Sequence, residues 1–419
     1  MNKAYEYRIY PTPEQEVLIR KTIGCARKVY NLILDDNNKY YKVNKKGKFN
    51  SPAYYKKDYP YLKDVDSDAL CGAWNNLQKA FKNFFKHRAD KPVFKSKKNN
   101  RQSYTTINRK NSIRFENGKL RLPKVGFVYG VWSRFCEGMI KSVTVKMKAN
   151  GKFFISVLTE QKPKVIESRM VIKEKVLGID MSMSGLGVTS NGNTFNPPKW
   201  FQLSQKKLKR AQRKLSRTEQ NSKRHEKQRI KVATIQDHIA NQRKDWLNKL
   251  STKLANENDV VVFEDINLQT MSRLFGKSIS QNGFGMFRTM LEYKLKDRLK
   301  QFIKADKFFA STQLCSYCGF KNQEVKGLNK LGIREWTCPV CGTVHDRDVN
   351  AAKNLVNHYN QITSASATEA HAHRDNVRPR KRIVKVRLRA VANEVRKIKG
   401  HGPELCSDSS GSNPSSTRL

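Results

Sequence analysis

The chain has few acidic residues and no long hydrophobic run. It carries 36 Asp and Glu against 83 Lys and Arg, which gives a formal net charge of +47 over 419 residues. No apolar stretch approaches the roughly 18 residues that a membrane-spanning helix needs, and the first residues read as folded protein rather than as a signal peptide. We therefore expect a protein that has no membrane segment and stays inside the cell.

Cysteine is too sparse, and too unevenly placed, for a disulfide framework. Of the eight cysteines, Cys25, Cys71 and Cys136 lie in apolar segments and Cys406 stands alone in a polar tail, while the other four form two close pairs. This distribution argues against a disulfide-stabilised secreted fold. Hydrophobic residues make up 38% of the chain, which is low but enough for two or three domains with cores.

The excess of positive charge predicts a polyanionic partner. The isoelectric point is about 10.1, and basic residues recur between aromatic ones, as in residues 82–86 and 91–95. Such interleaving suits a surface that follows a phosphate backbone while bases or riboses contact rings. A solvated basic surface would explain any single run, but it does not explain an excess of this size. We expect a nucleic acid as the partner.

The first residues predict a strand followed by helices. Residues 3–10 alternate between apolar and polar side chains, as in a half-buried strand. Residues 12–15, Thr-Pro-Glu-Gln, offer an N-cap, a proline at the first helical position and a capping-box glutamine, so a helix begins there. A second helix is expected from about Ser67, because apolar residues follow it at steps of three and four.

Residues 92–161 change to a pattern of short strands. Asn-Gly turns at 117–118 and 150–151 join segments of strand-forming residues, which predicts antiparallel hairpins in a small barrel or sandwich. Because the strand at residues 3–10 has no neighbouring partner in sequence, we expect it to complete this barrel. The helices of residues 12–90 would then be an insertion.

Two buried strands in the second half of the chain end at acidic residues. Residues 176–179 form an apolar strand that ends at Asp180, and residues 186–189 follow in a hairpin. Residues 260–263, Val-Val-Val-Phe, are typical of a strand buried in a mixed sheet and lead to Glu264. Residues 204 to about 257 predict one or two long basic helices between these strands.

A third acid, Asp348, stands at a predicted helix start. Hydrolysis of a phosphodiester with two divalent ions needs several carboxylates from separate elements, because Mg²⁺ prefers oxygen ligands and two ions must share some of them. Taken alone, Asp180 or Glu264 would more often be a cap or an ion-pair partner, because acids at strand ends are common. Together, in the order strand, strand, helix, Asp180, Glu264 and Asp348 fit the arrangement of ribonuclease H.

Four cysteines have the spacing of a zinc ribbon. The pairs Cys315-x2-Cys318 and Cys338-x2-Cys341 enclose 19 residues, and a glycine follows the second cysteine of each pair, as a tight knuckle requires. A disulfide pair or redox-active thiols are the alternatives, and neither is expected inside the cell. The spacing predicts a structural zinc ion held by Cys315, Cys318, Cys338 and Cys341.

These motifs resemble those of the TnpB family, the RuvC-type nucleases of insertion-sequence transposons, which are related to type V CRISPR nucleases. The resemblance covers residues 4–358 and includes residues 7–12 and 239–245, although residues 181–185 depart from the commoner family pattern. Its most specific segments are Gly178-Ile179-Asp180, Phe263-Glu264-Asp265-Ile266-Asn267, Ser311–Gly319 and His345–Leu355.

The resemblance implies an RNA-guided DNA endonuclease. Its guide RNA would derive from the transposon end, and it would cut double-stranded DNA beside a short flanking motif. By position in the family motifs, Asp180, Glu264 and Asp348, rather than Asp346, would be the catalytic acids and would hold Mg²⁺ or Mn²⁺, while the four cysteines would hold Zn²⁺. The protein would be prokaryotic, cytoplasmic and associated with the nucleoid.

The implied fold is a multidomain α/β and β architecture. An RNase H-like (RuvC) nuclease domain would contain an inserted zinc ribbon, and a small β-barrel, the wedge domain, would contain an inserted helical recognition domain. We expect the wedge barrel at residues 1–10 and 91–170, the recognition domain at 11–90, the nuclease domain at 171–310 and 345–364, the ribbon at 311–344, and a basic, mostly disordered tail at 365–419.

Three alternatives use the same sequence differently. A nuclease-inactive, RNA-guided DNA-binding repressor is expected to lack one or more of the acids, yet all three are present. A zinc-ribbon accessory protein of a transposase would leave those acids without a role. A type V CRISPR nuclease would share the chemistry, but the small size of the chain favours the transposon form.

Overall fold

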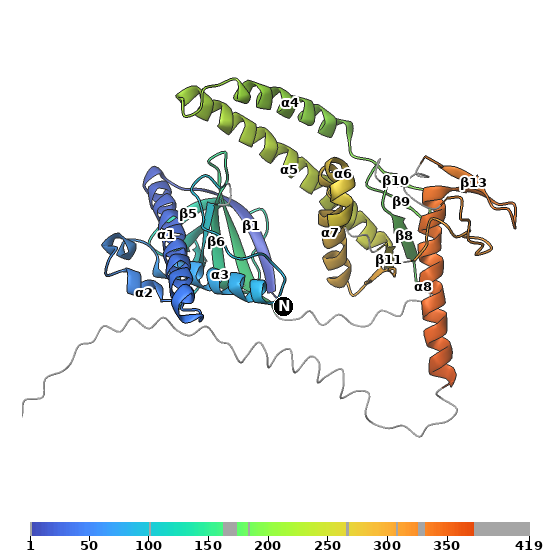
Figure 1. Ribbon diagram of the computed structural model, residues 1–419, viewed down its shortest axis with the longest axis horizontal. Coiled ribbons are helices and arrows are strands. Elements are labelled where there is room, and N and C mark those ends of the chain that lie inside the picture. Colours follow the sequence, from blue (N-terminus) through green and yellow to red (C-terminus); the bar gives the residue numbers. More distant parts are fainter. Residues whose placement is uncertain are drawn as a thin grey trace, which may run out of the picture. The chain divides into compact units, whose positions relative to one another are not determined.

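The computed structural model describes residues 2–99, 102–161, 174–182, 185–264, 268–306, 309–325 and 332–372. They belong to two compact units, one within residues 1–165 and the other within residues 166–386 (Figure 1). Among the described residues no helix is both long and apolar enough to cross a bilayer. The described part of the chain also holds no disulfide, and Cys406 lies outside it.

The first unit is built on one antiparallel sheet of seven strands, in the order β2-β6-β7-β1-β5-β4-β3. Strand β1 lies inside this sheet between β7 and β5, so the expectation that the first strand pairs with distant partners is confirmed. Both predicted hairpins are also present. The strands are β1 (Asn2–Tyr10), β2 (Gln102–Ile107), β3 (Arg114–Glu116), β4 (Lys119–Leu122), β5 (Gly126–Val131), β6 (Met139–Met147) and β7 (Phe153–Glu160).

The expected closed barrel is not formed by the hydrogen bonds of the described residues. Strands β2 and β3 end the sheet on its two sides, and no ladder joins them. Instead, the Asn108 side chain donates to the carbonyl of Ile140 at 2.9 Å and accepts from the amide of Ile113 at 2.9 Å. Ile140 lies on β6 and Ile113 directly precedes β3, so this side chain links the two segments without closing the strand ladder.

Helices cover one face of this sheet. The capping box at the start of α1 is confirmed, since the Thr12 side chain accepts from the amide of Gln15 and the Gln15 side chain accepts from the amide of Thr12. Helix α3 lies against β2 so closely that a Cβ on Gly72 would be 2.3 Å from the Thr105 carbonyl oxygen. The helices are α1 (Pro13–Asn44), α2 (Pro52–Tyr55), the 3-10 helix η1 (Pro60–Lys63) and α3 (Ser67–Phe85).

The second unit contains a mixed sheet of five strands, in the order β10-β9-β8-β11-β12. Strands β8, β11 and β12 are parallel and β9 is antiparallel to β8, so the predicted hairpin and the predicted mixed sheet are confirmed. The elements are β8 (Val176–Asp180), β9 (Gly187–Thr189), β10 (Thr194–Phe195), α4 (Lys199–Ser216), α5 (Lys223–Glu257), β11 (Val260–Phe263), α6 (Leu268–Asn282), α7 (Phe284–Lys296), β12 (Gln301–Lys304), β13 (Glu335–Thr337), β14 (Val344–Asp346) and α8 (Arg347–Ala372).

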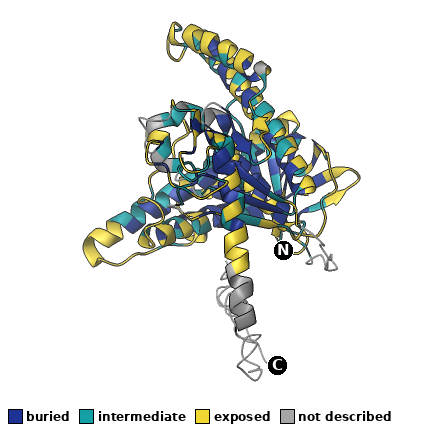
Figure 2. Ribbon diagram, turned by 90° about the vertical axis from the view of Figure 1, so that its right-hand side faces the viewer, coloured by how far each residue is buried: buried dark blue, intermediate teal, exposed yellow. Residues whose placement is uncertain are grey.

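Two long helices leave this sheet between β10 and β11. Helices α4 and α5 form an antiparallel hairpin, as Figure 1 shows, and its outer part is mostly exposed in Figure 2. The sequence predicted one or two long basic helices over residues 204 to about 257, and the structure has two, of which the first begins at Lys199.

The last helix corrects the expected start of the tail. Helix α8 continues to Ala372, whereas loss of structure was expected from residue 365. Four of the residues from 365 to 372 are alanine, the residue with the highest helix propensity, which accounts for the longer helix. The rest of the predicted tail, residues 373–419, lies outside the described residues.

Candidate metal centres and nucleic-acid surfaces

The register of two parallel strands brings the first two acids together. Ile179 of β8 pairs with Phe263 of β11, and each of these residues directly precedes an acid, Asp180 and Glu264. Neighbouring strands lie about 4.8 Å apart, so the two acids are neighbours at the carboxyl edge of the sheet. Burial of both strands explains the local fold, since all four residues of β11 are buried. The other residues of this motif, 265–267, lie outside the described residues.

Helix α8 carries the third acid toward the same edge. It crosses β8 at Gly178, where an added Cβ would lie 2.0 Å from the Ala352 carbonyl oxygen, so only glycine permits this contact. Asp180 follows Gly178 by two residues and shares its face of the strand, and Asp348 precedes Ala352 by one helical turn and shares its face of the helix. The small residues after Asp348 thus allow the close approach that the sequence indicated, and both Ala351 and Ala352 are fully buried.

The electrostatics of Asp180 reflect this convergence. Burial raises the pKa of its carboxyl well above the ordinary value, the charges of Glu264 and Asp348 raise it further, and the buried guanidinium of Arg347 lowers it. Burial also raises the pKa of Glu264. The three acids therefore form one cluster in which a buried carboxyl lacks enough positive charge, as expected of a place for a cation.

Asp346 and Asp348 have different environments. Asp346 is exposed, and its side chain accepts a 2.9 Å hydrogen bond from the amide of Val349, so it caps the start of α8. Asp348 is half-buried and is the one that acts on Asp180. Its carboxylate also accepts a 3.0 Å ion-paired hydrogen bond from Arg334, just before β13.

The acids are not gathered as tightly as the cysteines. Within the described part of the chain, the group of side chains close enough to share one ion consists of the four cysteines, and the three acids do not form a second such group. The ion pair of Asp348 with Arg334 favours this wider spacing, because it draws the Asp348 carboxylate toward the ribbon.

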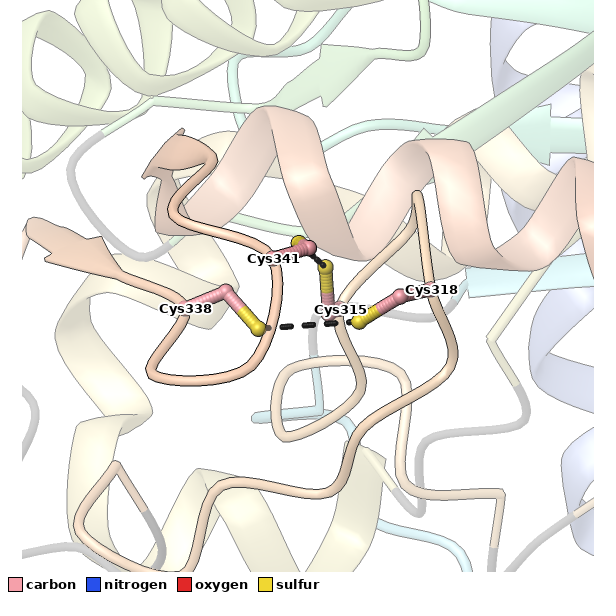
Figure 3. A group of neighbouring side chains, drawn as sticks. All are labelled: Cys315, Cys318, Cys338 and Cys341. Carbon is pink, nitrogen blue, oxygen red and sulfur yellow. Dashed lines mark hydrogen bonds between the residues drawn. The ribbon is translucent and has the colours of Figure 1, made fainter.

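The four predicted zinc ligands do converge. Their sulfur atoms lie within 4.8 Å of one another, and the Cys315–Cys341 and Cys318–Cys338 sulfur pairs are each 3.6 Å apart (Figure 3). A disulfide would need about 2.05 Å. Four sulfurs at about 2.3 Å from a tetrahedral zinc ion would be about 3.8 Å from each other. The cluster therefore fits a zinc ion and does not fit disulfides.

Each cysteine pair lies on a knuckle. The amides of Gly319 and Gly342 donate to the carbonyls of Cys315 and Cys338, both at 2.9 Å, and both glycines have a positive φ. His345 of β14 adds an outer contact, since its Nε2 lies 3.0 Å from the Cys315 sulfur.

The first knuckle is fixed to α8 by a row of asparagines that sequence reasoning missed. Asn350 donates to the carbonyl of Leu314 at 2.7 Å and accepts from the amide of Ser316 at 2.9 Å. Asn354 donates to the carbonyls of Ser311 and Leu314, both at 2.7 Å, and Asn357 donates to the carbonyl of Ser316 at 2.8 Å. Their spacing of four and three residues on one helix face was the available signal.

The tip of the α4–α5 hairpin forms a basic pocket of about 750 Å³. Five cationic side chains line it together with a single acid, Glu219. It also lies at the start of α5, where Ser222 caps the helix by accepting from the amide of His225 at 3.0 Å. Phosphate groups fit such a concave cationic surface at a helix start. The cationic residues are Arg210, Arg213, Lys214, Arg217 and Arg224.

Comparison with protein families gives three matches along the chain. Residues 1–46 match a family described as "Helix-turn-helix domain", residues 154–274 match "Probable transposase" and residues 284–355 match "Cas12f1-like, TNB domain". In this structure the first of these regions is strand β1 and the single helix α1 rather than a pair of helices.

Relatives and a solved structure extend these matches over nearly the whole chain. A protein of Streptomyces pristinaespiralis named "Putative RNA-guided DNA endonuclease" is 33% identical, with 97% of this chain and 99% of the relative covered. InsQ of Escherichia coli K12, which has the same description, is 31% identical over 84% of this chain and 91% of its own. The fold resembles that of Cas12f1 in a complex with sgRNA and target DNA, with a TM-score of 0.53 and 15% sequence identity. The match covers 85% of this chain and 98% of the Cas12f1 chain.

Proposed function

The chain belongs to the family of RNA-guided DNA endonucleases that these two relatives represent, and from this membership we propose that it is the RNA-guided DNA endonuclease of an IS605-type transposon. A guide RNA from the transposon end would select the target, and the protein would cut double-stranded DNA beside a short flanking motif. The observation that carries the proposal is geometric: the strand register sets Asp180 beside Glu264, and the contact of Gly178 with Ala352 brings the helix that carries Asp348 to the same edge.

The acid cluster suits divalent metal ions. Carboxylate oxygens from β8, β11 and α8 are hard ligands of the kind that Mg²⁺ and Mn²⁺ prefer, and a cation would supply the charge that the buried Asp180 lacks. When bound, two such ions stabilise the attacking and leaving oxygens in phosphodiester hydrolysis. Asp180 lies between Glu264 on the neighbouring strand and Asp348 on the helix, so we assign it the shared ligand position.

The four cysteines suit a structural zinc ion, because all four positions of a tetrahedral ion would be filled by sulfur. The ribbon that they close is bonded to α8 through Asn350 and Asn354. Zinc would in this way support the helix that carries Asp348.

The remaining parts would hold nucleic acid. We assign the seven-stranded sheet to the wedge domain, the helices between β1 and β2 to the recognition domain, and the β8–β12 sheet with α8 to the RuvC nuclease domain. Guide and guide–DNA heteroduplex would be recognised by shape and charge, while base pairing supplies sequence. The net charge of +47 and the basic pocket at the hairpin tip support this role.

Single substitutions of the acids test the proposal. Asp180→Ala, Glu264→Ala and Asp348→Ala should each abolish Mg²⁺-dependent cutting of a matched duplex, because each removes an ion ligand, while binding of guide and target persists. Asp346→Ala is the matched control: it removes a helix cap and should retain measurable cutting.

The measurement is cleavage by each purified variant with its guide, beside a binding assay on the same samples. If the wild type binds its target but does not cut with Mg²⁺ or Mn²⁺, the protein is an RNA-guided repressor instead. If Asp346 is essential and Asp348 is dispensable, the assignment of the third acid is wrong.

A further inference from the structure

The seven-stranded sheet has a face that its helices do not cover. Side chains on strands β1 and β5 alternate, and one set is buried: Tyr5, Tyr7 and Ile9 are at most 3% exposed. The opposite set includes Tyr10, Phe127 and Tyr129, which are 43%, 41% and 58% exposed. Large rings on the solvent side of a sheet are unusual in a protein that has a full core on the other side, and they mark an interaction surface.

Strand register joins these rings into one strip. Tyr10 of β1 lies opposite Tyr129 of β5, with their ring centroids 6.1 Å apart. Phe154 of β7 shares this face and lies opposite Arg8 of β1, and Arg8 lies opposite Val131 of β5. We call Tyr10, Phe127, Tyr129 and Phe154 the aromatic strip. Directly opposite residues on one sheet face have their Cβ atoms about 5 Å apart, so Tyr10 and Tyr129 are adjacent, while Arg8 lies between them and Phe154.

Cations line both sides of the aromatic strip. Lys119 and Arg121 of β4 lie opposite Tyr129 and Phe127, and both cations are exposed. The guanidinium carbon of Arg8 lies 4.7 Å from the ring centroid of Tyr10, and the Lys148 ammonium lies 4.0 Å from that of Phe154.

Several of these cations have no carboxylate partner. Among the described residues, no ion pair joins Arg8, Lys119 or Arg121 to an acid, and the buried Nε of Arg8 has no hydrogen-bond partner. Glu116 of β3 lies opposite Lys119, but its carboxylate is paired with Arg114 at 2.9 Å. A protein partner with an apolar surface would not satisfy these charges, whereas a nucleic-acid strand offers bases for the rings and phosphates for the cations. Duplex bases are already stacked, so the rings require unpaired nucleotides.

The hydroxyl-bearing half of the same face favours RNA. Thr105 of β2 and Thr144 of β6 lie opposite each other and bond through their hydroxyls at 2.9 Å, and Ser156 of β7 lies opposite Thr144. Ser156 also lies opposite the exposed Glu6 of β1, whose carboxylate is 3.7 Å from the Lys146 ammonium. Hydroxyl and carboxylate groups beside the strip can bond to the ribose 2′-OH, which DNA lacks.

We propose that the aromatic strip binds a short unpaired segment of RNA, with bases stacked on Tyr10, Phe127, Tyr129 and Phe154 and phosphates held by Arg8, Lys119 and Arg121. That this RNA is an unpaired part of the guide follows from the proposed function, and the inference rests on it in this respect. It adds recognition of single-stranded bases to recognition of duplex shape.

The test uses the full chain freed of bound RNA, and short oligouridylate and oligodeoxythymidylate of equal length as probes. Combined Phe127→Ala and Tyr129→Ala should weaken oligouridylate binding about tenfold or more, because stacking contributes strongly for each base, without changing the salt dependence. Tyr129→Phe keeps the ring and should bind as the wild type does. Tyr317→Ala removes an 80% exposed ring outside the strip and is the control.

Arg121→Gln should instead make the dependence of log affinity on log salt shallower by about one. Unchanged oligouridylate affinity in the double alanine variant would overturn the proposal, and equal or tighter binding of the deoxy probe would overturn the assignment to RNA. Neither guide nor metal enters this experiment, so a failure of the strip and a failure of the nuclease assignment are separate results.

Discussion

Lys294 of α7 is buried without a carboxylate partner among the described residues. It is 7% exposed, and its three N–H groups are shared among four acceptors at 2.7 to 2.8 Å: the backbone and side-chain oxygens of Asn248 and the hydroxyls of Ser251 and Thr252. Burial, together with the charge of Arg298, lowers the pKa of this lysine to about 8. The residue therefore joins α5 to α7 at an electrostatic cost.

This cost makes stability depend on pH in a defined direction. The pKa is about 8 in the folded protein and 10.5 in its ordinary state, so between these values the unfolded chain binds more protons and folding is favoured as pH rises. Between about pH 7 and about pH 10, the free energy of unfolding of the wild type should rise by on the order of 2 kcal/mol relative to that of Lys294→Met.

Urea unfolding of both proteins at the two pH values measures the gain. Lys296→Met, at an exposed position on the same helix, should show no such pH-dependent difference from the wild type. A gain that appears for both variants, or for neither, would mean that Lys294 titrates normally.

At the level of single residues, the sequence identified which residues could bind metal ions, but not which residues they contact in the fold. Acids at the ends of apolar strands and cysteines at knuckle spacing could be recognised, because strand register and metal geometry constrain them tightly. The pairing of Asp348 with Arg334 could not, since the two approach only when the ribbon folds back on α8. The catalytic role of the three acids stays a prediction.

Among the elements, the contact between the zinc ribbon and α8 allows a specific test. Asn354 is 3% exposed, and Asn354→Ala would leave the Ser311 carbonyl without its 2.7 Å donor. An unsatisfied buried carbonyl costs about 1 to 3 kcal/mol, so this variant should unfold at lower temperature and lose zinc to a chelator faster. Cys338→Ser should lower the zinc content itself.

Asn357→Ala provides the matched control for Asn354→Ala. Asn357 lies one turn further along the same helix and is exposed, so its single bond to the Ser316 carbonyl should contribute within about 0.5 kcal/mol. Equal effects of the two variants, or full zinc retention in both, would show that the asparagine row does not hold the ribbon.

The basic pocket at the hairpin tip predicts a salt effect. Replacing Arg213, Arg217 and Arg224 together by Gln should flatten the slope of log affinity for nonspecific RNA against log salt, by about one for each phosphate that these cations neutralise in the wild type. Lys249→Gln on α5 is the control, because Lys249 is paired with Asp245 at 2.8 Å. A slope unchanged in the triple variant would remove the pocket from the binding surface.

Short sequence motifs predicted the individual helices and hairpins well, but they did not predict whether the seven-stranded sheet closes into a barrel. The capping box of residues 12–15 and the Asn-Gly turns depend on a few adjacent residues, so they could be recognised directly. Whether β2 pairs with β3 depends instead on the curvature of the whole seven-stranded sheet, which no short sequence pattern specifies.

For the whole molecule, α8 ends at Ala372, so residues 373–419 can be removed without shortening this helix. Removal of residues 373–419 should reduce nonspecific RNA binding and its salt dependence, because this segment is rich in Arg and Lys, while guided cutting persists. Comparing the shortened and full proteins in both assays measures the effect. Loss of all cutting would make this segment part of the active assembly.

The position of β1 has a consequence for synthesis on the ribosome. This strand leaves first, but its partner β7 ends at Glu160, so about 150 residues must follow before the pair can form. At about 5 to 20 residues per second this takes roughly 8 to 30 seconds, during which the edge of β1 that faces β7 stays unpaired. A translation pause near the end of β7 would let the N-terminal unit fold before the long basic arm emerges, whereas a pause between α3 and β2 would prolong the time in which nascent chains can aggregate.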